Sequence, residues 1–382
     1  MEAFGKHLSR LTDQVYFFFG VLVKVSLLTL EIVLRIPTLA IHLDRQETFS
    51  FNKETQLFPI AGLVAAELNR QGKTEESEKP DEIPNGASED FKPLKAPTER
   101  HHPYVVELIA KEAGVDPSNI IDFEMILYDT QKACVGGLNE ELIFSARLDN
   151  LEMSYCSTMG LINSLKSPTA LDKETSIRLI SLFDHEEIGS RTAQGADSNM
   201  LPAIIRRLSV LPAIIRRLSV LPADSKGLTL DDLTDTVTAY EQTVASSFLI
   251  SADMAHSVNP NYAAKYESDH RPEMNKGTVI KINANARYAT NSPGIVLLQE
   301  VARRKGVPLQ LFVVRNDSSC GSTIGPMLSA ALGARTLDLG NAQLSMHSIR
   351  ETGGVYDVEY AIQLFESFFE HFSELEGRIF VD

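Results

Sequence analysis

The sequence predicts an α/β fold, in which helices cover both faces of a sheet of apolar strands. Two observations support this fold class. Beyond residue 146, short apolar runs alternate with longer amphipathic segments, which is the order expected of strands and helices that pack in layers. At 382 residues and 43% hydrophobic content, the chain can also bury a sizeable core, and its length allows two domains.

The elements follow from the spacing of apolar residues and from signals at the ends of each segment. Helices are predicted where apolar residues recur every three or four positions between capping residues. Strands are predicted for short runs rich in β-branched residues. In chain order the predicted elements are helix 60–69, helix 103–113, strand 120–128, strand 142–145, helix 151–165, strand 177–183, a long helical region up to 246, strand 248–251, strand 279–282, helix 292–305, strand 310–314, helix 326–332, strand 336–339 and helix 358–374.

Two stretches of the chain stand outside this pattern. The run 15–34 is apolar and long enough to span a bilayer, but Lys24 and Glu31 interrupt it, so it makes a poor membrane span. Targeting to a membrane or to secretion is therefore the weaker interpretation of this run. Residues 71–98 are acidic and rich in Pro and Ser, which predicts a solvated loop.

A ten-residue segment, 201–210, is repeated without change as 211–220. A shift of ten residues turns a helix by about 1000°, so the copied face is displaced by about 80° from the original. Pro212 also lies where it would break a single continuous helix. A recent duplication or an artefact of sequence assembly explains the repeat better than a binding device does.

Charge and cysteine content limit the partners and the compartment. The formal charge of −15 and the pI near 5.1 argue against nucleic acid, because phosphate binding needs clustered Lys and Arg. Cys134, Cys156 and Cys320 show neither C-x-x-C spacing nor an even disulfide framework. We therefore expect a reducing compartment, the cytoplasm, with a vacuole-like or lysosome-like compartment as the alternative.

A carboxylate or an imidazole follows several of the short apolar runs. Glu186 and Glu187 come after the run 177–183, and Asp149, Asp253 and His347 come after other runs. Open α/β sheets place ligands where their strands end, and one carboxylate can bind a metal while its neighbour handles protons. Taken singly, each residue is explained as well by a helix cap or a surface charge. As a set they predict a metallohydrolase site.

Taken together, these segments resemble the aspartyl aminopeptidases, the M18 family of zinc exopeptidases. The resemblance runs from about residue 32 to the C-terminus at residue 382. The motifs that carry it, in the order of the family, are LRIPTLAIHL at 34–43, RHH at 100–102, RLDN at 147–150, DHEEIGS at 184–190, SADMAH at 251–256, HRP at 270–272, RND at 315–317, CG at 320–321, TIGP at 323–326 and MHSIRE at 346–351.

The resemblance implies a site for two zinc ions. Asp149 would bridge them, Glu187 and His347 would complete the protein ligands of one ion, and Asp253 would bind the other. Glu186 would be the catalytic general base. The family also carries a long segment before the LRIP motif, with a His-Thr-Asp motif whose histidine is a zinc ligand, and no His-Thr-Asp occurs here. We therefore expect one zinc site to be incomplete and the chain, as written, to have little activity.

The resemblance also implies specificity for an acidic N-terminal residue. Lys281 matches the position that supplies a positive charge for the substrate carboxylate, with Tyr288 and His256 near it in the motif order. His42 matches a catalytic histidine that the family's inserted domain extends into a neighbouring subunit to stabilise the reacting oxyanion. The alternatives are a lysine at a strand edge for Lys281 and a partly buried structural histidine for His42.

The domain organisation implied by the resemblance has three parts. Residues 1–31 are an apolar segment unmatched in the family, and residues 32–145 are the remnant of an inserted, mainly β dimerisation domain. Residues 146–382 are the C-terminal part of a zinc peptidase catalytic domain with a helix-covered mixed sheet. We expect a zinc-dependent metallo-aminopeptidase that removes N-terminal Asp or Glu from peptides and forms homo-oligomers. The alternative is a catalytically dead truncated paralogue or fragment that acts only through its subunit-contact surface.

Overall fold

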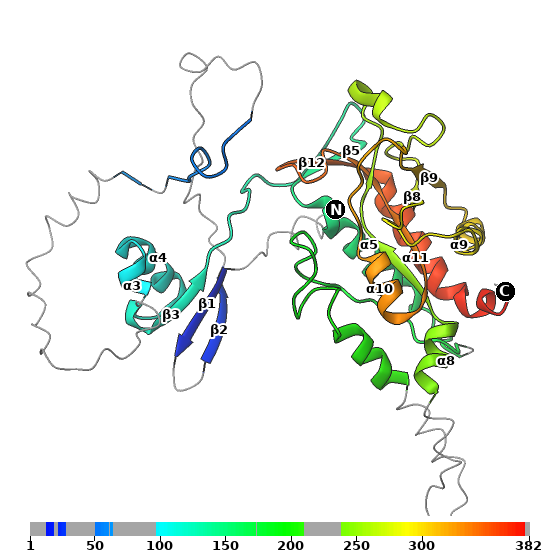
Figure 1. Cartoon of the computed structure of the whole chain (residues 1–382), viewed down its shortest axis with the longest axis horizontal. Helices are drawn as coiled ribbons and strands as arrows, with labels where there is room; N and C mark the ends of the chain where they lie inside the picture. The colour runs from blue at the N-terminus through cyan, green and yellow to red at the C-terminus, as the bar shows by residue number, and fades with distance from the viewer. Residues whose placement is uncertain are drawn as a thin grey trace, which may run out of the picture. The chain divides into compact units, whose positions relative to one another are not determined.

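A computed structural model describes residues 13–18, 22–27, 50–60, 62–63, 97–172, 174–209 and 238–378. The chain divides into two compact units between Gln131 and Lys132 (Figure 1). The predicted boundary lies later, between residues 145 and 146. It differs because the strand at 142–145 pairs with a strand near residue 351, inside the second unit.

The first unit contains a small antiparallel sheet. Strand β1 (Asp13–Phe18) lies between β2 (Leu22–Leu27) and β3 (Ile120–Glu124) and pairs antiparallel with both. Part of the apolar run 15–34 thus forms strands. None of the helices in the described ranges is long and apolar enough to cross a membrane.

The described part of the first unit also contains two α-helices, α3 (Pro97–Arg100) and α4 (Pro103–Ala113). Helix α4 has the bounds predicted from its end signals. The His102 ring accepts a hydrogen bond from the Tyr104 N–H at its start, and Gly114, with φ of 67°, ends it in the left-handed region. The predicted helix 60–69 falls mostly outside the described residues.

The second unit contains two mixed sheets, and the core sheet has four strands. Their order is β6 (Phe248–Ala252), β10 (Arg335–Gly340), β8 (Thr278–Ile282) and β9 (Leu309–Val313). The outer pairs β10–β6 and β8–β9 are parallel, and the central pair β10–β8 is antiparallel. The two central strands are mostly buried, as expected for strands covered on both faces.

The other sheet has five short strands. Their order is β4 (Cys134–Gly136), β5 (Leu142–Ser145), β12 (Glu351–Gly354), β11 (Ala342–Leu344) and β7 (Ala255–His256). All pairs are antiparallel except β11–β7. The sequence predicted β5 but not the other four, because runs of two to four residues are too short to show a period.

The helices of the second unit correspond to those predicted. They are α5 (Leu148–Ser164), α8 (Ala239–Ser246), α9 (Ser292–Lys305), α10 (Gly325–Leu332) and α11 (Val355–Glu376). Residues 200–209 are also helical. The second copy of the ten-residue repeat and Pro212 lie outside the described residues.

Helices cover both faces of β10. Leu337 lies against Gly294 of α9, whereas the next residue, Asp338, lies against Gly325 of α10. Because successive side chains of a strand point to opposite faces, α9 and α10 must lie on opposite sides of the sheet. Helix α11 packs against both α9 and α5 (Figure 1). The predicted layered α/β fold with a helix-covered mixed sheet is therefore confirmed.

The prediction of a strand at residues 177–183 is wrong. In the described chain this segment is irregular and joins no sheet, and Leu179 and Leu182 are 44% and 59% exposed. Strand β6 lies at the edge of its sheet, so its outer side also lacks a described neighbour. An apolar run becomes a strand only where another strand supplies hydrogen bonds, and that partner is not encoded locally.

A buried carboxylate in α5 makes stability depend on pH. Glu152 is 0% exposed, and one of its oxygens accepts a hydrogen bond of 2.9 Å from the Asn341 side chain. The other oxygen has no hydrogen bond within the described residues. Burial, with a smaller contribution from the charges of Asp357 and Glu351, raises the pKa of Glu152 from 4.5 to about 7.

The Glu152→Gln variant is expected to gain stability over the unaltered chain as pH rises. Below pH 4.5, the Glu152 carboxyl is protonated in both the folded and the unfolded chain and contributes no pH dependence. Between pH 4.5 and about 7 only the unfolded chain loses the proton, so folding stability falls, by up to about 3 kcal/mol. The amide cannot ionise. Urea unfolding of the variant and of the unaltered chain at pH 4, 6 and 8 measures the difference in their free energies of unfolding. A difference that stays the same at all three pH values would contradict the prediction.

Candidate metal centre

Three predicted ligand side chains converge in the second unit. Asp149 lies at the start of α5, Glu187 follows the segment 177–183, and His347 follows β11. Their ligand atoms all lie within 4.8 Å of one another. The His347 Nε2 atom is 3.2 Å from Asp149 Oδ2 and 3.3 Å from Glu187 Oε2. Atoms bound to one tetrahedral zinc at about 2.0–2.2 Å lie about 3.3–3.6 Å apart, so these separations fit a single ion.

The backbone at His347 is held in an unusual conformation. Its φ of 64° is in the left-handed region, which costs a residue with a side chain about 1–3 kcal/mol. Its N–H donates a hydrogen bond of 2.8 Å to the buried carboxylate of Glu351. A hydrogen bond to a charged group contributes about 1.5–3 kcal/mol, enough to offset the strain. Glu351 was not among the site residues predicted from the sequence.

Two further predicted residues, Asp253 and Lys281, lie beside this group. Asp253 follows β6, and its carboxyl is a hydrogen-bonding neighbour of the Asp149 carboxyl. The Lys281 Nζ atom on β8 is 3.3 Å from Asp253 Oδ2 and its side chain is only 3% exposed. Strands β6 and β8 are not paired with each other, so the two residues meet only because β10 lies between them.

The electrostatics of the cluster favour a cation. Burial, followed by the charges of Asp253, Glu187 and Glu351, raises the pKa of Asp149 to about 9. Burial and the charges of Asp253 and Glu187 also raise the pKa of Glu186. Carboxylates packed this closely are stabilised in their charged form by a bound dication. Two carboxylates and an imidazole are also ligand types that zinc accepts, so the residues present fit a zinc ion.

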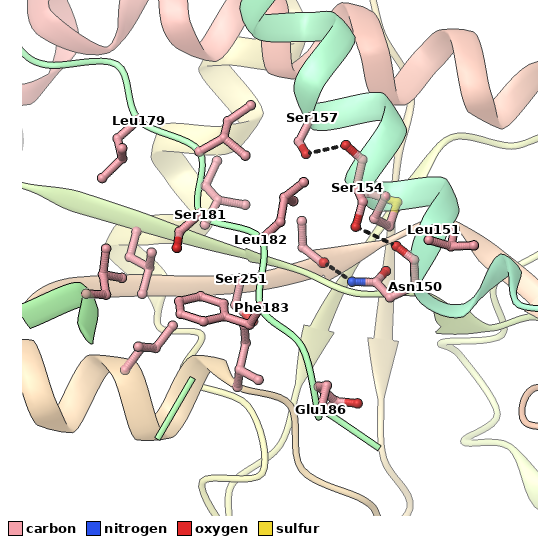
Figure 2. A pocket seen from close by; sticks show the side chains of 18 of the residues that line it. Asn150, Leu151, Ser154, Ser157, Leu179, Ser181, Leu182, Phe183, Glu186 and Ser251 are labelled. Atoms are coloured by element: carbon pink, nitrogen blue, oxygen red, sulfur yellow. Dashed lines mark hydrogen bonds between the residues drawn. The ribbon is translucent and has the colours of Figure 1, made fainter. Parts of the chain in front are cut away.

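A cavity of about 500 Å³ opens beside the cluster. Figure 2 shows Leu179, Leu182 and Phe183 along one wall and Ser154 of α5 on another, with Glu186 at one end. Strand β6 and helix α11 contribute further lining residues. The volume lies within the range of about 300–1,000 Å³ that is typical of ligand sites.

The predicted substrate-binding residues form a second group around Lys281. The ring of Tyr288 lies 5.5 Å from Lys281 Nζ, and the Cys320 thiol donates a hydrogen bond of 3.3 Å to the Tyr288 hydroxyl. Burial raises the pKa of Tyr288. The His256 ring packs against Phe312, and desolvation by the surrounding residues, followed by the charge of Lys281, lowers the pKa of His256.

One predicted catalytic residue, His42, lies outside the described residues. The described part of the chain brings together five of the predicted site residues: Asp149, Glu186, Glu187, Asp253 and His347. The contact between Cys320 and Tyr288 was not foreseen, because no spacing rule links residues so far apart in the chain.

Comparisons with known proteins identify relatives along most of the chain. The profile of the family described as Aminopeptidase I zinc metalloprotease (M18) matches residues 23–369. The chain is 71% identical to the aspartyl aminopeptidase of Aspergillus oryzae, over 92% of this chain and 69% of that protein. The profile match begins before residue 32, where the sequence analysis placed the start of the resemblance.

Solved structures agree with this relationship. In the cryo-EM structure of the Ape4 and Nbr1 complex, one chain is 45% identical and matches with a TM-score of 0.81, covering 97% of this chain and 64% of that one. The S. cerevisiae mApe1 dodecamer matches at 29% identity and a TM-score of 0.66, over 96% of this chain and 69% of that one.

The chain thus spans about two thirds of the length of the relatives it matches. These relatives favour a hydrolase over the alternative of a dead paralogue that acts only through subunit contacts. With a profile match from residue 23 to residue 369 and a ligand cluster of the type that zinc binds, the chain belongs to the M18 family of zinc metalloproteases.

Proposed function

We propose that this chain is a zinc-dependent aminopeptidase that removes N-terminal Asp or Glu from peptides and works as a homo-oligomer. The observation that carries the proposal is the convergence of Asp149, Glu187 and His347 beside Glu186, in a chain 71% identical to an aspartyl aminopeptidase. The resemblance of each motif, in the order of the family, supports the same assignment.

Asp149, Glu187 and His347 would hold one zinc ion, and Asp253 would bind a second ion that shares Asp149. Bound zinc would polarise the peptide carbonyl and lower the pKa of a water molecule. Within the described residues only Asp149 and Asp253 are assigned to the second ion, one fewer than the three protein ligands typical of catalytic zinc. Zinc stoichiometry of the purified protein therefore tests the two-ion assignment.

Glu186 would act as the general base. It lines the cavity next to Glu187, so its carboxylate lies at the ligand cluster without being needed as a ligand. A carboxylate in this position can accept a proton from the attacking water and deliver it to the amine that leaves. Proton transfer by a residue placed in this way accelerates hydrolysis by about 10²–10⁴-fold.

Lys281 would recognise the acidic side chain of the substrate. It is a buried cation whose partner here is Asp253, itself a proposed ligand. A substrate carboxylate that enters this region needs a positive partner, because a buried charge without one is costly. Tyr288 and His256 would shape the same subsite, since the Tyr288 ring lies near Lys281 Nζ and the Lys281 charge acts on His256.

Oligomerisation and location are extrapolated from the relatives and from the cysteines. The mApe1 dodecamer supports a homo-oligomer, and we propose that His42 stabilises the oxyanion in a neighbouring subunit. Cys134, Cys156 and Cys320 are all free thiols, which supports a reducing compartment such as the cytoplasm. A vacuole-like compartment is the alternative.

The function is tested on a version of the protein that carries the family's His-Thr-Asp segment, by loading it with zinc and comparing substrates that begin with Asp and with Leu. We expect the Asp substrate to be preferred. Lys281→Ala should lower kcat/KM for the Asp substrate by about 10–100-fold, the effect of a hydrogen bond to a charged group, and should change the Leu substrate far less.

Lys276→Ala is the matched control, because Lys276 is an exposed lysine just before the strand that carries Lys281. It should leave both substrates unchanged. A Lys281→Ala variant that keeps the normal ratio of Asp to Leu cleavage would exclude Lys281 from the substrate pocket. Absence of aminopeptidase activity in a zinc-loaded, folded version that carries the family's His-Thr-Asp segment would contradict the proposed function.

A further inference from the structure

The carboxylate of Glu351 joins the backbones of two proposed zinc ligands. Glu351 begins β12 and is only 2% exposed. One of its oxygens accepts a hydrogen bond of 3.0 Å from the Asp149 N–H, and the other accepts one of 2.8 Å from the His347 N–H. The Gln343 side chain also approaches the second oxygen, at 3.5 Å. A single side chain thus connects the start of α5 with the loop after β11.

Both bonded N–H groups lie where regular structure is interrupted. Asp149 has φ of −77° and ψ of 112°, which are not helical values, although it is at the start of α5. His347 has φ of 64° and belongs to no strand or helix. Neither N–H is therefore bonded within a helix or a strand ladder, and the Glu351 carboxylate supplies the acceptor that each of them needs.

The His347 side chain has little else to hold it in place. It is 63% exposed, so packing does not fix the orientation of its ring, whereas the Asp149 side chain is 7% exposed. The position of the ring relative to Asp149 then depends on where the His347 backbone is anchored. Glu351 anchors that backbone to the same carboxylate as Asp149.

We propose that Glu351 is a positioning residue that sets the separation between Asp149 and His347, and thereby the affinity and coordination geometry of the zinc site. The inference rests on the zinc ligands assigned under the proposed function. Residues that orient metal ligands without touching the metal typically change affinity by about 10–100-fold when they are replaced.

Glu351→Gln tests this role. Glutamine has one acceptor oxygen, and its NH₂ group would face an N–H donor, so one of the two backbone bonds must be lost. We expect the Kd for zinc to rise about 10–100-fold. The visible absorption spectrum of the Co²⁺-loaded variant should also differ in shape from that of the unaltered protein, because the spectrum reports ligand geometry and a purely structural role would not alter it.

Glu152→Gln is the matched control. Glu152 is a buried carboxylate, as Glu351 is, and both variants replace a carboxylate with an amide. Glu152, however, bonds to the Asn341 side chain and to no ligand backbone. The Kd of the Glu152→Gln protein for zinc should stay within about threefold of the value for the unaltered protein. That change is much smaller than the change in Kd expected when a residue that orients ligands is replaced. Its Co²⁺ spectrum should match that of the unaltered protein.

The outcomes separate the two proposals. An unaltered chain that is folded but binds no zinc would contradict the proposed function itself. Zinc binding by the unaltered chain, with Glu351→Gln indistinguishable from Glu152→Gln, would overturn only the positioning role.

If Glu351→Gln does not fold, hydrogen exchange on the unaltered chain decides the question. The amides of Asp149 and His347 should exchange at least about tenfold more slowly than the amide of Ile349, which is 77% exposed in the same loop. Fast exchange at either amide would overturn the role of Glu351.

Discussion

In a version of the protein that carries the family's His-Thr-Asp segment, Glu186→Gln is expected to remove most of the aminopeptidase activity while leaving zinc bound. The amide keeps the shape of the side chain but cannot accept the proton of the attacking water. A loss in kcat of about 10²–10⁴-fold is therefore expected, since that is the usual contribution of a general base. Steady-state kinetics with an Asp-terminal peptide, together with zinc analysis of the same preparation, measures both quantities.

Glu187→Gln is the comparison that separates a base from a ligand. Glu187 is the adjacent residue, but its oxygen lies 3.3 Å from His347 Nε2 within the ligand cluster. Its replacement should weaken zinc binding as well as activity. Turnover of Glu186→Gln close to that of the unaltered protein would assign the proton transfer to another group.

Gly340→Ala is expected to destabilise the second unit strongly. Gly340 ends β10, and an added Cβ would overlap the carbonyl oxygen of Asp253, so one of the two backbones must move. Overpacking of a closed site costs about 1–3 kcal/mol and occasionally more, and we expect about 3 kcal/mol because the obstacle is backbone. Because Asp253 is a proposed ligand, the Gly340→Ala variant should also bind zinc more weakly.

Urea unfolding and zinc titration test the Gly340 variant. Gly377→Ala is the control, because an added Cβ there meets no atom within 4 Å and the backbone is in the ordinary right-handed region, with φ of −67°. This variant should differ from the unaltered chain by less than about 1 kcal/mol. Equal stability of the two variants would mean that β10 and Asp253 are not in contact.

Several elements were predictable because their ends are encoded locally. Helix α9 has the predicted bounds: Asn291 accepts a hydrogen bond from the Gly294 N–H at its start, and Gly306, with φ of 72°, ends it. The core strands β8 and β10 were predicted to within one or two residues, although each carries a buried charged residue, Lys281 in β8 and Asp338 in β10.

Pairing between distant segments was not predictable in the same way. The run 177–183 has the composition of a strand but has no described partner, and the four short strands of the second sheet exist only because each has one. Hydrogen bonds between strands depend on residues far apart in the chain. Local sequence therefore predicts which segments can form strands, and not which of them do.

For the site, the sequence by itself determined the kinds of residue and their family order: carboxylates at 149, 186, 187 and 253 and an imidazole at 347. The resemblance already implied that Asp149, Glu187 and His347 share one ion. Only the tertiary structure decided how closely their ligand atoms lie, that Lys281 pairs with Asp253, and that Glu351 holds two of the ligand backbones. The physical reason is that ligand distances and backbone hydrogen bonds are set by how strands and loops pack in space, whereas spacing along the chain records only the chemistry available to each of them.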